Sequence, residues 1–180
     1  MWDQDLYLKT LIFASKAHHH QKIPGTVMSY VVHFTNVAME VANTLIHSND
    51  IDLDGTYAIQ CALLHDTIED TAVTYEDIVA EFGIPIAKGV LALTKNSSIA
   101  KENQMIDSLN RIIEEGPEIR IVKMADRINN LQPPPLHWDN IKKINYHKQA
   151  QLILNILSGV NPYIEGRLEQ KIKDYEQYFD

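Results

Sequence analysis

The sequence predicts an all-α protein that folds as a compact multi-helix bundle. Apolar residues recur every three to four positions along most of the chain, as in helices with one buried face, whereas the alternating pattern of strands is scarce. Glycines and prolines interrupt these runs, for example at Gly83, at Gly116-Pro117 and from Pro133 to Pro135. With 180 residues, of which 45% are apolar, the chain is large enough to bury one full core.

Nine helices are expected in chain order. Asp52 or Asp54 is placed to cap the third helix, and Thr74 with Asp77 resembles a capping box. No linker or internal repeat divides the chain, so residues 1–180 are expected to form a single domain. Its motif-bearing core is expected at about 17–150, with a C-terminal helix at about 162–179. The expected helices are Asp5–Gln21, Tyr30–His47, Leu53–His65, Thr74–Phe82, Ile84–Leu93, Ile99–Glu115, Glu118–Leu131, Asn140–Leu157 and Pro162–Phe179.

Charge and composition limit the kinds of partner. The formal net charge of −8 argues against a broad electropositive surface for nucleic acid. The lone cysteine, Cys61, excludes an internal disulfide and fits a reducing compartment. No apolar run reaches membrane-spanning length, and the first residues lack a basic segment followed by an apolar block. We therefore expect a cytoplasmic protein without nucleic-acid or membrane partners, while the sequence leaves the oligomeric state open.

The most informative stretch is LLHDTIED, residues 63–70, because it combines nitrogen and oxygen ligands for a divalent metal. Two further ligands of these types lie in other apolar, helix-periodic runs, which would bury their polar atoms. A buried carboxylate without a partner costs several kcal/mol, so a partner is expected. The alternative is that these side chains are ordinary core polar groups with satisfied hydrogen bonds. The predicted metal ligands are His33, His65, Asp66 and Asp126.

This set of ligands predicts hydrolytic chemistry. Two imidazoles and two carboxylates favour Mn²⁺, Fe²⁺ or Zn²⁺ over Mg²⁺, and the absence of cysteine ligands argues against a closed structural zinc. Incomplete protein coordination leaves room for water and a phosphate oxygen, and the metal would lower the pKa of that water. Glu69 and Asp70 follow one helical turn after the His-Asp pair, so they are candidate proton acceptors and orienters for the water. Their alternative role is that of a solvated helix end.

The same motifs, taken in order, resemble those of the HD-domain metal-dependent phosphohydrolases, and in particular the hydrolase domain of RelA/SpoT homologues. The resemblance rests on HDxxED at 65–70, Phe82-Gly83, LTK at 93–95 and VKMADR at 122–127, and it spans about 17–150. Those enzymes remove pyrophosphate from the 3′ position of (p)ppGpp. No synthetase or regulatory domain follows, so the chain most resembles the single-domain small alarmone hydrolases. The resemblance implies a manganese-dependent guanosine-3′,5′-bis(diphosphate) 3′-pyrophosphohydrolase, in which Glu69 and Asp70 serve the attacking water.

Residues that would contact the nucleotide are also implied by the resemblance. Asn130 follows the ADR motif by one turn, and Tyr30 precedes His33 by three positions. Lys142 and Tyr146 resemble a basic–aromatic pair that reaches the ribose and phosphates. The alternative is that Lys142 is an ordinary surface lysine and Tyr146 a half-buried tyrosine without a role in binding. Lys22 is a further candidate for local positive charge.

The chain departs from the family pattern where the base is usually read. Ser29 and Phe34 replace prolines on either side of the Tyr30 motif, and the loop after His18–His20 has a different length. Adjacent helical residues diverge by about 100°, so the three histidines are not expected to bind one ion. These changes predict weak discrimination between guanine and adenine.

Two other functions remain open from the sequence. One is an HD-type phosphatase acting on another nucleotide, such as ppApp or the 2′-phosphate of NADPH. The other is a non-catalytic module that binds a nucleotide or a protein partner. Arg127, next to Asp126, has two open roles as well: it either holds a metal ligand or touches the substrate.

Overall fold

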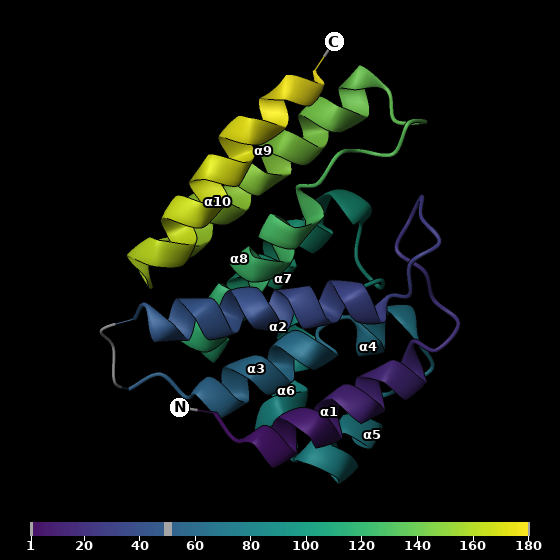
Figure 1. Cartoon of the computed structure of the whole chain (residues 1–180), viewed down its shortest axis with the longest axis vertical. Helices are drawn as coiled ribbons and strands as arrows, with labels where there is room; N and C mark the ends of the chain where they lie inside the picture. The colour runs from purple at the N-terminus through teal and green to yellow at the C-terminus, as the bar shows by residue number, and fades with distance from the viewer. Residues whose placement is uncertain (1, 49–51, 180) are drawn as a thin grey trace.

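The computed structural model describes residues 2–48 and 52–179, and within these ranges the chain is a bundle of helices (Figure 1). The described residues contain no strand, and one isolated antiparallel bridge joins Lys22 to Ser29. The all-α prediction is therefore confirmed. The helices are α1 (Gln4–Ala17), α2 (Val31–Ile46), α3 (Gly55–Leu64), α4 (Thr67–Asp70), α5 (Tyr75–Phe82), α6 (Ile84–Leu93), α7 (Lys101–Glu115), α8 (Pro117–Asn130), α9 (Asn140–Leu157), α10 (Pro162–Tyr175) and the 3₁₀ helix η1 (Glu176–Tyr178).

Helix starts follow the capping signals of the sequence. Asp54 caps α3 by accepting a hydrogen bond from the backbone N–H of Tyr57, so Asp54, rather than Asp52, is the cap. Thr74 and Asp77 form the predicted capping box at α5. Such a cap typically stabilises a helix by about 1 kcal/mol. None of the helices in the described ranges is both long and apolar enough to span a bilayer.

The short helix α4 was not expected from the sequence, and it matters for the site. Helix α3 ends at Leu64, and the backbone turns at His65 and Asp66 before α4 begins at Thr67. The hydroxyl of Thr67 donates a 2.6 Å hydrogen bond to the carbonyl of Leu64, which satisfies a group that the interrupted helix leaves free. The expected first helix is also too long, because it ends at Ala17 and the three histidines form a turn.

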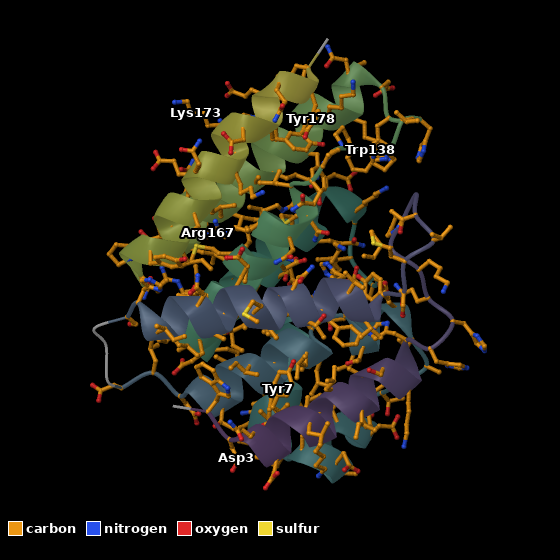
Figure 2. The ribbon with its side chains drawn as sticks, viewed as in Figure 1. Asp3, Tyr7, Trp138, Arg167, Lys173 and Tyr178 are labelled. Atoms are coloured by element: carbon orange, nitrogen blue, oxygen red, sulfur yellow. The ribbon has the colours of Figure 1, made fainter. Side chains whose placement is uncertain are left out.

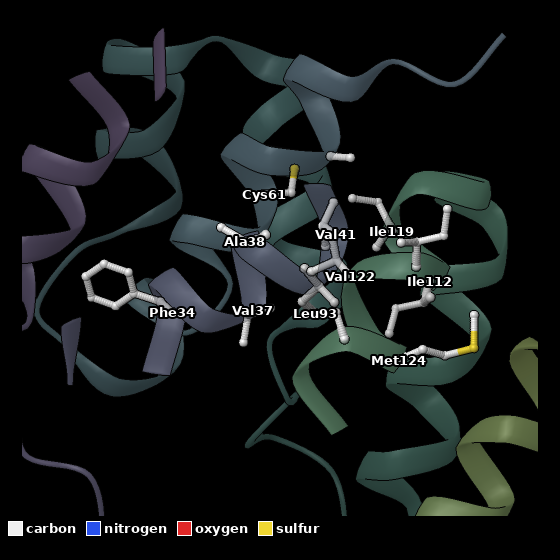
Figure 3. Packing of buried hydrophobic residues seen from close by; sticks show 14 of the residues in the cluster. Phe34, Val37, Ala38, Val41, Cys61, Leu93, Ile112, Ile119, Val122 and Met124 are labelled. Atoms are coloured by element: carbon white, nitrogen blue, oxygen red, sulfur yellow. The ribbon is translucent and has the colours of Figure 1, made fainter. Parts of the chain in front are cut away.

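The helices that carry the candidate ligands pack against one another around a shared apolar core. Helix α2 lies between α3 and α8, and its residues Phe34, Val37 and Val41 are fully buried (Figure 3). Val122 of α8 is buried in the same cluster. Burying a side chain of this size contributes roughly 1.5–3 kcal/mol, so the relative positions of these helices are strongly fixed.

Helices α9 and α10 form an antiparallel hairpin at one end of the bundle, and α10 also packs on α8 (Figure 1). The guanidinium of Arg167 on α10 forms a two-atom ion pair with Glu40 of α2, with Nε 3.1 Å from Oε2 (Figure 2). Nearby, the amide of Asn43 donates a hydrogen bond to the hydroxyl of Tyr163. These contacts tie the hairpin to the helix that carries His33.

Helices α3 and α6 approach closely at Gly89. A Cβ atom at this position would lie 2.6 Å from the Tyr57 hydroxyl, and 2.8 Å from both Cys61 Sγ and Ile119 Cδ1. Gly89 is itself buried in the middle of α6. A larger residue would force at least one of these side chains to shift, so the contact favours glycine, although a glycine inside a helix costs about 1 kcal/mol relative to alanine.

Candidate metal centre and active site

The four predicted metal ligands meet at the junction of α2, α3, α4 and α8. His33 lies in the first turn of α2, Asp126 lies within α8, and His65 and Asp66 occupy the turn between α3 and α4. The Nε2 atoms of His33 and His65 are 3.2 Å apart. The Asp66 Oδ2 atom lies 2.8 Å from His65 Nε2 and 3.5 Å from His33 Nε2. The Asp126 Oδ1 atom lies 3.6 Å and 3.7 Å from the same two nitrogens.

This arrangement fits a divalent cation. The Nδ1 atom of His65 is 2.8 Å from the carbonyl of Ala62, which can only accept, so Nδ1 carries a proton and Nε2 is the atom that faces a metal. Ligand atoms about 2.1 Å from one ion lie roughly 3–3.5 Å from each other, which is close to the spacing found here. His33, His65 and Asp66 form the tighter group, and Asp126 completes it from the side of the histidines.

The charges of the side chains at the centre also favour the binding of a cation. Burial opposes ionisation of Asp66, but His65 and His33 outweigh it and hold the pKa of this carboxyl well below its usual range. Burial likewise opposes ionisation of Asp126, but Lys123 and then His65 lower its pKa to about 2. Burial alone would lower the pKa of His65, yet Asp66 and Asp126 raise it to about 9. Two ionised carboxylates are thus gathered in a largely buried place, where a cation offsets their desolvation.

Side chains around the centre orient the two carboxylates. The hydroxyl of Tyr30 donates a 2.5 Å hydrogen bond to Asp66 Oδ2. Lys123 Nζ donates to Asp126 Oδ2 at 2.9 Å, and Asn130 Nδ2 donates to Asp126 Oδ1 at 2.5 Å. The i,i+3 and i,i+4 spacing of these partners around Asp126 is visible in the sequence. Tyr30 and Asn130 were predicted at the nucleotide, and the structure places both against candidate metal ligands.

Glu69 and Asp70 lie on the short helix α4, and each has a dedicated partner. Glu69 accepts hydrogen bonds from both the backbone N–H of Lys95, at 3.0 Å, and its ammonium group, at 2.5 Å. Asp70 Oδ2 accepts from the amide of Gln21 at 2.9 Å, and Gln21 in turn bonds His18 at 2.6 Å. Neither partnership was foreseen from the sequence, because Lys95 and Gln21 lie far from α4 along the chain.

The predicted basic–aromatic pair lies on α9, where Tyr146 contacts Arg127, the neighbour of Asp126, and Lys142 is exposed. The Tyr146 ring is 4.3 Å from the guanidinium carbon of Arg127, and the ammonium of Lys142 is 4.4 Å from the ring centre of Trp138, just before α9 (Figure 2). Arg127 is buried, and its Nε and Nη1 atoms have no hydrogen-bond partner among the described residues, so it does not hold a metal ligand through these atoms. Lys22 is exposed in the loop before Tyr30.

Two histidines and two carboxylates from separate segments meet at one point of this helical bundle. Proteins of the helix-bundle class commonly build metal sites in this way. The chain belongs to the HD-domain family: the family model described as HD domain matches residues 10–153. This confirms the family to which the sequence motifs point, and with it a divalent-metal site as the general character of the centre.

Curated relatives and solved structures agree with this assignment. A guanosine-3′,5′-bis(diphosphate) 3′-pyrophosphohydrolase of Danio rerio is 32% identical over 171 residues, covering 91% of this chain and 90% of the relative. The protein of the same description from Homo sapiens is 28% identical and covers 92% of both chains. Among solved structures, a metazoan ortholog of SpoT that hydrolyses ppGpp superposes with a TM-score of 0.82 at 22% identity, over 97% of both chains. A protein of Listeria monocytogenes superposes with a TM-score of 0.64 at 22% identity, over 83% of this chain and 99% of that one.

Proposed function

We propose that this protein is a metal-dependent guanosine-3′,5′-bis(diphosphate) 3′-pyrophosphohydrolase, which hydrolyses (p)ppGpp to GDP or GTP and pyrophosphate. The observation that carries the proposal is the convergence of His33, His65, Asp66 and Asp126 next to the helix that bears a pair of carboxylates. The relative from Danio rerio, which matches nearly the whole chain, supports the choice of substrate.

The proposed cofactor is one Mn²⁺ ion, with Fe²⁺ or Zn²⁺ as the alternatives that the same ligands suit. When bound, the cation would supply Lewis acidity, which polarises a phosphate oxygen and makes water a better nucleophile near neutral pH. The chain's own residues hold the ligands in place: the Tyr30 hydroxyl orients Asp66, and Lys123 and Asn130 orient Asp126.

Glu69 and Asp70 are the proposed groups that act on the attacking water. Tyr30 lies within electrostatic range of Asp70, since burial first and then the carboxylates of Asp66 and Asp70 raise the pKa of its hydroxyl. Asp70 is thus close to the ligand cluster, as a proton acceptor for the water has to be. The ammonium of Lys95 holds Glu69 at the same edge.

The substrate's phosphates are proposed to meet positive charge and hydrogen-bond donors around the metal. The candidates are Lys142 and Tyr146 at the start of α9, Asn130 at the end of α8, and Tyr30 and Lys22 at the loop before α2. Charge-assisted contacts to phosphate oxygens are strong and largely independent of the base. This agrees with the prediction of weak base discrimination.

The decisive experiment is a product assay. Purified protein is incubated with ppGpp and Mn²⁺, and released pyrophosphate and orthophosphate are quantified separately, with the Asp66→Ala variant as the inactive control. Stoichiometric pyrophosphate with GDP supports the proposal. Orthophosphate release, or turnover confined to ppApp or NADPH, would instead indicate an HD-type phosphatase of other specificity. Binding without turnover would indicate a non-catalytic module.

A further inference from the structure

The two carboxylates of α4 are held in different ways. Both oxygens of Glu69 accept hydrogen bonds from Lys95, one from its backbone N–H and one from its ammonium group. Only Oδ2 of Asp70 accepts a side-chain hydrogen bond, from the neutral amide of Gln21, and its Oδ1 accepts none within the part of the chain that the structure describes. Glu69 is therefore engaged through both oxygens, whereas Asp70 keeps Oδ1 available to accept a hydrogen bond from a water.

Gln21 is itself fixed from both ends. An ionised carboxylate only accepts hydrogen bonds, so Gln21 presents its NH₂ group to Asp70 and its carbonyl oxygen to His18. The Nδ1 atom of His18 must then donate across the 2.6 Å contact. The His18 side chain is 2% exposed and packs against the rings of Tyr30 and Phe34, with centroids 5.0 Å and 5.7 Å away. In the hydrogen-bond series from His18 through Gln21 to Asp70, each group therefore donates toward Asp70.

Asp70 also faces open space that water can fill. It lines a hollow of about 350 Å³ together with His18, Gln21 and neighbouring residues of both loops. A group that accepts a proton in each turnover has to return it, and this hollow connects Asp70 with solvent. Glu69 is not among the residues that line it.

We propose that Asp70 takes the proton of the attacking water, that Gln21 is the positioning residue that aims it, and that Glu69 stays paired with Lys95. This division of roles rests on the proposed function. The water oxygen forms a bond to the phosphorus attached to the ribose 3′-oxygen, and one proton of the water passes to Asp70. The bond from that phosphorus to the 3′-oxygen breaks, and its electron pair remains on the 3′-oxygen, which takes a proton from solvent. Asp70 then gives up its proton to solvent through the hollow.

A double-mutant cycle tests the proposal. Gln21→Ala should lower kcat for ppGpp by about 10- to 100-fold, with KM and metal content within twofold of the unaltered protein, since the lost contact affects only the orientation of a general base. In an Asp70→Asn background, the same substitution should change kcat by less than about twofold, because residues that act as one unit are not additive. Thr26→Ala, in the same loop, is the matched control and should leave kcat unchanged.

Gln21→Glu is a second test. This variant keeps the volume of the side chain and the acceptor for His18, and it removes the donor to Asp70. It should reproduce the loss in kcat of Gln21→Ala. Wild-type kcat in both Gln21 variants, or losses that multiply fully with that of Asp70→Asn, would overturn the assignment while leaving the proposed function intact. An unaltered protein that releases no pyrophosphate from ppGpp would overturn both.

Discussion

Replacing Gly89 with alanine should destabilise the protein, against the usual preference of helices for alanine. Three atoms would lie within 3.0 Å of the new Cβ, namely the Tyr57 hydroxyl oxygen, Cys61 Sγ and Ile119 Cδ1. Overpacking of this kind typically costs about 1–3 kcal/mol, and three simultaneous overlaps place it at the upper end. Alanine recovers about 1 kcal/mol of helix propensity, so the net loss is about 2 kcal/mol in the free energy of unfolding. For a chain of this size, that corresponds to a fall in Tm of about 4–8 °C.

Gly166→Ala is the matched control, because Gly166 also lies within a helix but nothing lies within 4 Å of the position that its Cβ would occupy. It should stabilise the protein by about 0.5–1 kcal/mol. Urea unfolding followed by far-UV circular dichroism measures both variants on the same protein background. If Gly89→Ala is as stable as the unaltered protein, α3 and α6 are not as closely packed as described, and the reasoning from steric overlap is wrong.

Three further predictions concern the site. Asp66→Ala and Asp126→Ala should each abolish stoichiometric metal in elemental analysis of the purified protein, and full metal content in both variants would refute the ligand assignment. Chelation of the unaltered protein should lower its Tm, because a ligand that binds only the folded state, at a concentration 100 times its Kd, stabilises that state by about 2.7 kcal/mol. Glu69→Gln and Asp70→Asn should both retain the metal and lower kcat, Asp70→Asn by about 10²–10⁴-fold, the usual scale of general acid–base catalysis. Wild-type turnover in both would make them ordinary carboxylates. The kcat/KM values for ppGpp and ppApp, measured at one manganese concentration, should agree within about tenfold, or about 1.4 kcal/mol, whereas a thousandfold preference for guanine would reveal base-reading residues in the altered loop.

The helices and the choice of candidate metal ligands that lie together were predictable because their signals are local or strongly patterned. Apolar periodicity located α2 and α8, and the caps at Asp54 and Thr74 were readable from a few neighbouring residues. The third helix was predicted to end at His65 and ends at Leu64. The short helix α4 was not predicted, because four residues are too few to show a helical period.

Contacts between distant segments could not be predicted in the same way. Lys95 belongs to the LTK motif and Gln21 to the end of an expected helix, but nothing in the sequence states which carboxylate each will meet. For Asn130 the spacing was readable but did not identify one partner. Its one-turn distance from Asp126 fits both the predicted nucleotide contact and the observed hydrogen bond to the carboxylate. Pairing across a fold depends on how the helices dock, which is a property of the whole core.

The distribution of the candidate ligands along the chain sets the order in which the protein can acquire its ion. His33, His65 and Asp66 are made early in synthesis, whereas Asp126 lies in α8 and is made long afterwards. The four come together only when α2, α3 and α8 have packed, so the unfolded chain offers no preformed site. If the four residues bind an ion as proposed, it would bind last and would link the first half of the chain to the second. Conditions that strip the metal should therefore loosen the contact of α8 with α2 before the rest of the bundle.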